Sequence, residues 1–330
     1  MVLAEGALRL YGSGIYPVPL YPGDVVAERD RTYDAVLGWK LAPGEPIRET
    51  TAGYDVTYEV NAQGFRSRYD FAAPSPSSSV TRRIAFLGDS FTFGSGVREE
   101  ETFVAVVERR LKRTERRSGL AARGEIQAFN YGLGGFGVDQ MGLALEHYAL
   151  PWGANFVVVS FIRNDLDRSL SSYRKGHVWL EKPAFHLERG ALVPTTAANR
   201  PGILASWFAQ DLRLGRLWQK AESSLANRWP IGGRWRLNRA FFARMRDACS
   251  AAGVPLLVVH IPVNRHAPAP LYAREFAELG IDFLDLAPLL PADAGELYFL
   301  NDHHFTPAGH RFAGRAIARA ILTRGLLPAR

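Results

Sequence analysis

Short apolar runs alternate with longer amphipathic stretches throughout residues 80–330 of this 330-residue chain. The runs are rich in β-branched and aromatic residues, and the stretches between them have helical spacing. This alternation favours a parallel sheet covered by helices on both faces, because each parallel crossover needs a helix-length connection. We expect strands at 83–87, 125–130, 155–161, 255–260 and 281–285, and helices near 101–117, 137–149, 236–252, 270–279 and 307–323.

The first 79 residues have a different composition. Proline, glycine and tyrosine are frequent, and Asp55-Val-Thr-Tyr-Glu-Val60 alternates as a half-buried strand does. Residues 72–79 have the Pro/Ser composition of a linker. We therefore expect a β-rich amino-terminal extension and linker at 1–79 and a second domain at 80–330. That domain carries an insertion at about 166–235, with a hairpin near 185–193 and a helix at 203–225.

The strand expected at 83–87 runs directly into Gly88-Asp89-Ser90. Open α/β sheets bind ligands at the carboxyl ends of their strands, which is where this turn would lie. If a helix follows, Ser90 stands at its N-terminus, where free N–H groups favour negative charge. The tripeptide alone is equally typical of ordinary turn and N-cap chemistry. Further catalytic groups elsewhere are needed to favour a nucleophile.

Three later segments carry such groups. Asn130-Tyr-Gly-Leu-Gly-Gly-Phe-Gly137 follows an expected strand and can present backbone N–H groups. A second strand ends near Asn164, whose side-chain amide is a donor, and Asp302 precedes His304 just before a helix opened by Pro307. A serine, donors for an oxyanion, an acid and a base make up the groups that acyl transfer requires.

In this order the motifs resemble those of the SGNH (GDSL-type) hydrolases. The resemblance covers roughly residues 83–165 and 297–321 and implies a flavodoxin-like three-layer α/β/α sandwich. It also implies Ser90 as nucleophile, His304 as base, and an oxyanion hole formed by the Ser90 and Gly135 N–H groups and the Asn164 amide.

The chain departs from the family pattern at three positions. The family's acid commonly lies three residues before the histidine, where this chain has Asn301, and the carboxylate is one residue closer, at Asp302. We assign the acid to Asp302, because an asparagine could orient the imidazole but not stabilise its charge. Ile162 replaces a usual glycine and Phe91 a usual leucine. Both changes leave the catalytic groups in place but could reshape the acyl pocket.

Other interpretations of the same residues stay open. Gly132–Gly137 also matches the Gly-x-Gly-x-x-Gly turn of dinucleotide-binding proteins, although no acidic residue closes the next strand at the expected interval. His303, His304 and His310 with Asp302 could ligate a metal, but the histidines lack the i, i+4 spacing of a helical pair. We therefore expect no metal and no cofactor.

Two further acidic residues and two of these histidines have simpler roles. We expect Asp89 and Asp165 to shape loops by accepting bonds from backbone N–H groups. We expect His303 to be a pocket wall or a solvated loop residue, and His310 to pack or cap a helix.

Composition limits the partners. The net charge of +7 is spread through arginine-rich helices such as 108–117 and 234–246, without a basic stripe interleaved with exposed aromatics. Nucleic acid is therefore not an expected partner. A basic surface still suits anionic lipid or an acidic polysaccharide, so proximity to a membrane surface stays open, as does the oligomeric state.

The sequence gives little information on the compartment. The single cysteine, Cys249, excludes an internal disulfide and fits a small packing residue. The amino terminus has no signal-peptide pattern, and no window reaches the ~20 apolar residues of a membrane span. The terminus resembles the stretch after the membrane anchor of many SGNH relatives, so a start further upstream would imply an extracytoplasmic, tethered protein.

Together these observations predict a serine esterase that works through an acyl-enzyme on short acyl esters, with O-acetyl groups of a bacterial carbohydrate preferred. That substrate rests on the range of the family and on the aromatic and polar insertion. Trp179, Trp207 and Trp218 of this insertion could equally pack it onto the core. An O-acyltransferase, a lipid esterase or thioesterase, and a non-catalytic ligand-binding protein with this fold are the alternatives.

Overall fold

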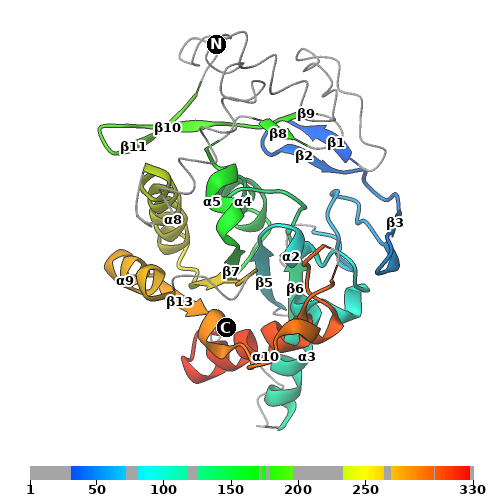
Figure 1. Ribbon diagram of the computed structural model, residues 1–330. Coiled ribbons are helices and arrows are strands. Elements are labelled where there is room, and N and C mark those ends of the chain that lie inside the picture. Colours follow the sequence, from blue (N-terminus) through cyan, green and yellow to red (C-terminus); the bar gives the residue numbers. More distant parts are fainter. Residues whose placement is uncertain are drawn as a thin grey trace.

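Five apolar segments pair into one parallel sheet at the centre of the molecule (Figure 1). They are β5 (Thr81–Leu87), β6 (Glu125–Asn130), β7 (Phe156–Phe161), β12 (Leu256–His260) and β13 (Asp282–Asp285). The strand order β13-β12-β7-β5-β6 becomes 2-1-3-4-5 when the strands are numbered along the chain and read from the β6 edge. This is the flavodoxin-like order, and the predicted fold class is confirmed.

The computed structural model describes residues 31–71, 81–117, 125–170, 173–175, 179–195, 233–263, 269–300 and 302–327. The linker predicted at 72–79, the helix predicted at 203–225, and Asn301, Trp207 and Trp218 lie outside the described residues, as do the side-chain surroundings of Trp179.

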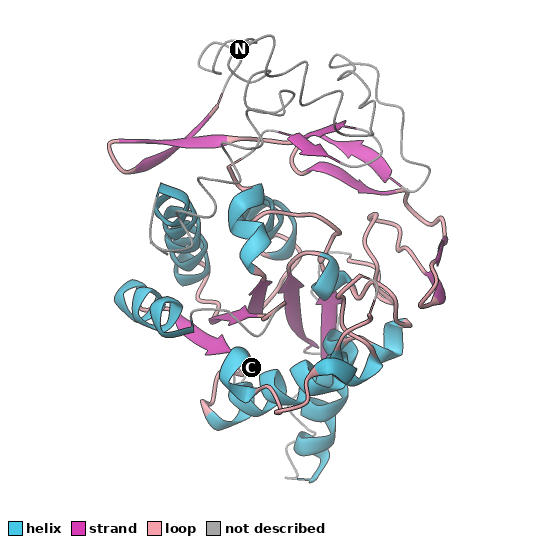
Figure 2. Cartoon of the chain, in the orientation of Figure 1, coloured by secondary structure: helices cyan, strands magenta, loops and turns pink. Residues whose placement is uncertain are grey.

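Helices cover both faces of the sheet, as Figure 2 shows. Alternate side chains of β5 enter different cores. Ile84 and Phe86 pack with α3 (Phe103–Arg117) and α10 (Pro307–Thr323). Ala85 and Leu87 pack with α4 (Val138–Ala144), α8 (Gly233–Ala251) and α9 (Ala269–Leu279). All six residues of β7 are buried, which its unbroken apolar sequence predicts for a central parallel strand. Two further helices of the described residues are α2 (Ser90–Phe93) and α5 (Arg163–Arg168).

One predicted helix, at 137–149, differs in detail. It begins as α4 and continues as the π-helical segment η3 (Leu145–Ala149). Short 3-10 turns are η1 (Glu99–Glu101), η4 (Ala287–Leu289) and η5 (Gly295–Leu297). No described helix is long and apolar enough to cross a membrane.

Two antiparallel hairpins precede the sheet, which confirms the β-rich amino-terminal unit. They pair β1 (Arg31–Asp34) with β2 (Gly38–Leu41) and β3 (Ile47–Thr50) with β4 (Asp55–Tyr58). Leu37 and Trp39 are buried in the same apolar cluster as α4 and α8, and the Gln140 amide donates to the Leu37 carbonyl. The unit therefore shares the core of the larger domain. The division at 79/80 remains a prediction.

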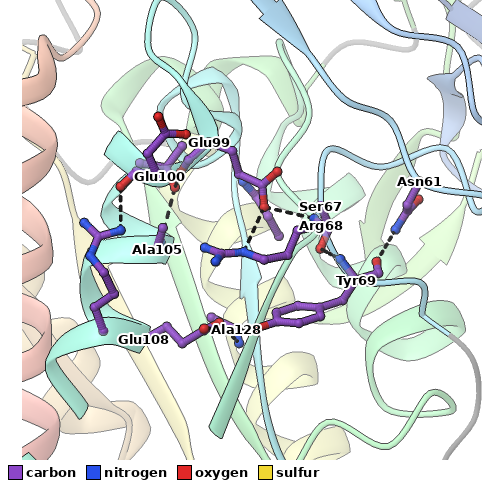
Figure 3. A network of polar contacts seen from close by, with 12 residues as sticks. Asn61, Ser67, Arg68, Tyr69, Glu99, Glu100, Ala105, Glu108 and Ala128 are labelled. Atoms are coloured by element: carbon purple, nitrogen blue, oxygen red, sulfur yellow. Dashed lines mark hydrogen bonds and ion pairs between the residues drawn. The ribbon is translucent and has the colours of Figure 1, made fainter. Parts of the chain in front are cut away.

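A polar network attaches the segment after β4 to the sheet and its helices (Figure 3). Arg68 binds the Glu99 carboxylate of η1 through its backbone N–H and its guanidinium. The Tyr69 hydroxyl donates to Glu108 of α3, and Glu108 also accepts the Ala128 N–H of β6. One buried carboxylate thus joins the amino-terminal segment, a helix and a strand.

The described part of the insertion consists of two hairpins. They pair β8 (Tyr173–Lys175) with β9 (Trp179–Glu181) and β10 (Phe185–Glu188) with β11 (Ala191–Pro194), and the second confirms the predicted hairpin. Lys182 forms a buried ion pair with Asp139 of α4. Phe185 packs edge-on against Phe241 of α8. These contacts dock the insertion on the helices beside the sheet.

Candidate active site

The turn after β5 places Ser90 as the first residue of α2, as predicted. Asp89 caps this helix by accepting the Phe91 N–H at 2.9 Å, which confirms its expected loop-shaping role. Gly88 is required for close approach, because an added Cβ would lie 1.9 Å from Thr92 Oγ1 and 2.8 Å from the Ser160 carbonyl oxygen. The turn leaves the Ser90 hydroxyl partly exposed at the carboxyl edge of the sheet.

His304 reaches this hydroxyl from a loop far along the chain. Its Nε2 lies 2.8 Å from Ser90 Oγ. The loop is held by backbone bonds from Phe299 N–H to the His304 carbonyl and from His303 N–H to the Phe299 carbonyl. His303 occupies the left-handed region with φ +61° and is exposed, which places it in the solvated loop rather than in the core. The loop thus turns sharply so that His304 faces the serine.

Asp302 lies on the other side of the imidazole. Its Oδ2 is 3.1 Å from His304 Nδ1, an ion-pair distance, although Nδ1 is not aligned for a hydrogen bond with any described acceptor. Catalytic contacts of this kind are often poorly aligned before substrate binds. Asp302 Oδ1 also accepts the His304 backbone N–H at 3.0 Å. Burial raises the pKa of Asp302, but hydrogen bonds from His304 and Tyr54 outweigh burial and leave the pKa below its usual range.

Tyr54 brings the amino-terminal unit into the site. Its hydroxyl lies 2.9 Å from Asp302 Oδ2 and 3.1 Å from Glu49 Oε1. One hydroxyl proton can be donated to only one of the two carboxylates at a time. Glu49 also accepts from Tyr58, whose oxygen in turn accepts the Gly96 N–H after α2. A hydrogen-bonded chain therefore runs from the loop after α2, through the β3–β4 hairpin, to Asp302.

A second charged cluster lies next to the turn that carries Ser90. Arg168 of α5 contacts Asp89 Oδ2 at 3.1 Å and Asp165 Oδ1 at 2.5 Å. Asp165 is fully buried and accepts the Ile162 N–H, which confirms its loop-shaping role. Burial and the nearby Asp89 carboxylate raise the pKa of Asp165 well above its usual range, and Arg168 offsets part of this effect. The cluster ties the turn after β5 to the turn after β7.

Gly135 and Asn164, the residues expected in the oxyanion hole, follow the two strands that flank β5. Gly135 follows β6 with φ +82°, and Asn164 lies in the first turn of α5, exposed, directly after β7. Asn130 is buried and shapes the glycine loop: its amide donates to the Thr92 carbonyl and its oxygen accepts the Gly132 N–H. The structure thus places Gly135 and Asn164 at the sheet edge where Ser90 lies, and their role as donors remains a proposal.

Two other histidines, His310 and His260, are buried in the core. His310 is buried in α10 and accepts the Phe103 N–H at the start of α3, so it caps a helix as expected. Burial, with smaller effects from Arg66 and His304, lowers the pKa of His310 to about 3. His260 at the end of β12 pairs with Asp285 at 2.9 Å inside the core. Neither ring approaches the serine by any described contact.

The two substituted family positions are core residues. Phe91 and Ile162 are 3% and 4% exposed and belong to the apolar cluster around α3 and α10. The Phe91 ring packs against the rings of His304 and Phe305 at 5.3 Å and 5.0 Å. The Phe91 ring therefore packs against the His304 imidazole, a contact that a sequence motif alone does not show.

Sequence reasoning missed three residues that hold the site. Two of them are Tyr54, which contacts Asp302, and Arg168, which contacts Asp89 and Asp165. The third is Arg66, which is buried under the loop after α2 and donates to the carbonyls of Phe93, Gly94 and Val97. The i, i+3 spacing of Asp165 and Arg168 was a usable signal. Tyr54 and Arg66 carried none, because their partners are distant in sequence.

Residues 264–329 match the family described as "SGNH hydrolase-like domain, acetyltransferase AlgX". The matched segment includes Asp302 and His304 but not Ser90. The resemblance to SGNH hydrolases predicted from the motifs is confirmed. No curated protein matches the chain.

Several solved structures are similar in part. One is a two-domain esterase (CEX) active on acetylated mannans, co-crystallised with mannopentaose, with TM-score 0.44 and 17% identity. The match covers 76% of this chain and 51% of that protein, so this chain spans about half of its length. The lipase/acylhydrolase from Enterococcus faecalis has TM-score 0.42 and 15% identity, with 76% of this chain and 98% of that one covered. The acetyl xylan esterase AlAXEase has TM-score 0.40 and 13% identity, with 73% and 98% covered.

Proposed function

We propose that the chain is a serine esterase that acts through an acyl-enzyme, with Ser90 as nucleophile, His304 as base and Asp302 as the carboxylate beside the imidazole. The observation that supports this best is the 2.8 Å contact between Ser90 Oγ and His304 Nε2. A histidine in hydrogen-bond reach of a hydroxyl, with a carboxylate at its other nitrogen, is the arrangement that activates a serine.

The proposed reaction has two halves. His304 Nε2 accepts the hydroxyl proton while Ser90 Oγ attacks the ester carbonyl carbon, and Asp302 stabilises the resulting imidazolium. His304 then gives the proton to the departing alkoxide, the ester C–O bond breaks, and an acyl-Ser90 ester and a free alcohol result. Water, deprotonated by His304, attacks this ester and releases the carboxylic acid. Ser90 thereby regains its proton.

We assign the oxyanion hole to the Ser90 and Gly135 N–H groups and the Asn164 amide. The positions of Gly135 and Asn164 after the strands on either side of β5 support this assignment. Loss of one oxyanion donor typically lowers kcat by about 100- to 1000-fold. Asn164→Ala should therefore retain the fold and lose activity in this range.

Tyr54 is a positioning residue in this proposal. Its hydroxyl contacts the same oxygen of Asp302 that faces His304 Nδ1, so it restrains the carboxylate where the imidazole needs it. The tyrosine ring is itself held against Phe299 at 5.0 Å. The β3–β4 hairpin would thus contribute to catalysis without touching the reacting atoms.

The proposed substrate is a short acyl ester, with an O-acetyl group on a bacterial carbohydrate preferred. The description of the matched family as an acetyltransferase supports the acetyl group. The same description favours a second candidate, an O-acyltransferase, in which a sugar hydroxyl replaces water in the second half-reaction. Phe185 of the insertion packs on α8, so this aromatic residue supports the core rather than a sugar.

Labelling with a fluorophosphonate tests the nucleophile. Intact mass should show one adduct on the wild-type protein and none on Ser90→Ala. Ser95→Ala, a serine on the neighbouring loop, is the matched control and should label normally. A folded wild-type protein without an adduct, or an adduct that persists on Ser90→Ala, would contradict the assignment.

An acetyl donor then separates the two candidates. With p-nitrophenyl acetate in water the esterase releases acetate, whereas the acyltransferase shows a burst of p-nitrophenol and resumes turnover only when a carbohydrate acceptor is added. Mass analysis of the acceptor would reveal the transferred acetyl group.

A further inference from the structure

Helices α3 and α10 lie side by side on one face of the sheet (Figure 1). His310 contacts Phe103 and Gly314 packs on Val106, so the contacts advance in the same direction and the helices run parallel. An added Cβ at Gly314 would lie 2.6 Å from Val106, which explains why the helices approach so closely there. Along their outer sides lies an open groove of about 1170 Å³.

Positive charge dominates this groove. Of the sixteen described residues that line it, ten are Lys or Arg and one, Glu108, is acidic. Glu108 is engaged by Lys112, Tyr69 and the Ala128 N–H, so its charge is already compensated. The remaining lining residues are aliphatic or threonine, and none is aromatic.

The arginines form two rows. Arg311, Arg315 and Arg319 follow each other every four residues on the exposed side of α10, and Arg109, Arg113 and Arg116 follow the exposed side of α3. Four helical residues rise about 6 Å, so each row presents a guanidinium at about that interval.

Several of these charges have no counter-ion among the residues that the structure describes. Arg113, Arg116, Arg315 and Arg319 form no ion pair with a carboxylate in the described part of the chain. Residues 118–124, which follow α3, add one arginine and no acidic residue to the sequence. Clustered like charges repel and destabilise the fold, so an anion that binds here would relieve a cost already present.

We propose that the α3–α10 groove binds an extended acidic polysaccharide. Arginine binds carboxylates and sulfates through paired N–H donors, and two parallel rows of such donors match a linear chain whose charges recur along its length. The aliphatic floor formed by Val106, Ala318 and Leu322 suits the apolar faces of sugar rings.

The groove fits two other polyanions less well. Single-stranded nucleic acid relies on aromatic side chains for base stacking, and no described residue of the groove supplies one. A membrane surface is flat and is usually entered by protruding apolar side chains. The apolar faces of α3 and α10 are buried in the core instead.

The groove also begins near the candidate active site. Helix α10 starts three residues after His304, and Arg311 lies in its second turn. If the acidic polymer carries the ester that Ser90 attacks, the groove holds the substrate chain beside the reaction centre. That link rests on the proposed esterase function, whereas binding in the groove does not.

Calorimetric titration of the full chain with polygalacturonate at about 0.1 M NaCl tests the site. Arg311→Gln/Arg315→Gln/Arg319→Gln should bind at least about tenfold more weakly than wild type, since three charges of one row are lost. The matched control, Arg239→Gln/Arg246→Gln/Arg274→Gln, removes equal charge from α8 and α9, where each arginine already pairs with a carboxylate, and should bind within about twofold of wild type. Neutral dextran should not bind.

Several results would overturn the proposal. These are absence of polygalacturonate binding, equal weakening by both triple variants, or tighter binding of single-stranded DNA or of phosphatidylserine vesicles at the same groove. Turnover of p-nitrophenyl acetate separates this inference from the esterase proposal. The groove variant should keep that turnover. A protein that binds the polymer but never turns over an ester would refute the proposed esterase function and leave the proposed polysaccharide binding in the groove intact.

Discussion

In the described part of the chain, two histidines each lie close to an aspartate, and the two pairs have opposite surroundings. His304 is 3.1 Å from Asp302, with side chains 25% and 28% exposed, and its other ring nitrogen faces Ser90. His260 is 2.9 Å from Asp285, with side chains 2% and 10% exposed, and its ring lies against Phe161 and Tyr272.

The same contact between a carboxylate and an imidazole thus occurs once in a closed core and once beside a serine, where we propose a catalytic role. His260 joins the ends of β12 and β13, so its bond to Asp285 fixes two strands in a closed core. His304 stands in a loop with one face open, so the same contact can support proton transfer. Access of the second ring nitrogen to a hydroxyl distinguishes the two.

The largest expected contrast comes from replacing each histidine with glutamine. His304→Gln should lower kcat/KM by about 10⁴-fold or more while the melting temperature stays nearly constant, because it removes the proposed base from a partly exposed loop. His260→Gln should keep activity within severalfold and lower the free energy of unfolding by about 1–3 kcal/mol, because a buried hydrogen bond is lost. Ester hydrolysis and thermal denaturation of both variants measure this, and the reverse pattern would mean that the pairs were misassigned.

The aspartates should differ in the same way. Asp302→Asn should lower kcat by about 10³- to 10⁴-fold, because an uncharged partner no longer stabilises the imidazolium. Asn301→Ala and Asp285→Asn should each change kcat by less than about tenfold. A larger loss in Asn301→Ala than in Asp302→Asn would show that the acid is not Asp302.

A smaller effect is expected at the tyrosines that accompany each pair. Tyr54→Phe keeps the ring contact with Phe299 but removes a hydrogen bond to a carboxylate, so kcat should fall about tenfold with KM nearly unchanged. The lost bond holds the pKa of Asp302 down, so its removal should shift the titration profile of the Asp302 carboxyl, followed by NMR, to higher pH. Tyr272→Phe, on the ring that packs against His260, should leave both kcat and the profile unchanged. An unshifted profile in Tyr54→Phe would contradict a positioning role.

The smallest effect on activity is expected at His310, a third histidine without an aspartate. Burial lowers its pKa to about 3 in the folded state, so folding stability from this group is complete above pH 6.5 and is lost as pH falls from 6.5 toward 3. The free energy of unfolding should therefore fall by about 1.4 kcal/mol per pH unit through this window, and His310→Gln should remove that part of the slope. Denaturation at pH 7, 6, 5 and 4 measures it; an identical slope in both proteins would show that His310 is not buried as a neutral ring.

Much of the fold could be predicted because local pattern specifies it. The strands predicted at 125–130 and 155–161 coincide with β6 and β7 to within one residue, the second of them as an apolar run, and the Pro307 start signal coincides with α10. Burial on both faces makes a parallel strand an unbroken apolar run, and a proline at the first helical position marks a helix start. The split of the 137–149 helix into α4 and η3 was missed, since periodicity does not distinguish an α-helix from a π-helical continuation.

The candidate site was predictable only in its residue types and their order. Gly88-Asp89-Ser90 and Asp302-x-His304 could be recognised in the sequence, because turn-forming residues and short spacings are local features of a chain. Nothing local distinguishes Tyr54 from the other tyrosines, or Arg66 from the other arginines, since each acts on a partner brought close by folding. Tyr54 and Asp302 are 248 positions apart.

The sequence by itself determined the alternation of strands and helices, the turn that presents Ser90, and the order of the candidate catalytic groups, because these depend on burial period, turn residues and spacing along the chain. The tertiary structure decided which histidine faces Ser90, which tyrosine contacts Asp302, and how two arginine-rich helices come to border one groove. Those properties depend on distances between segments remote in sequence, and only the packing of the core sets such distances.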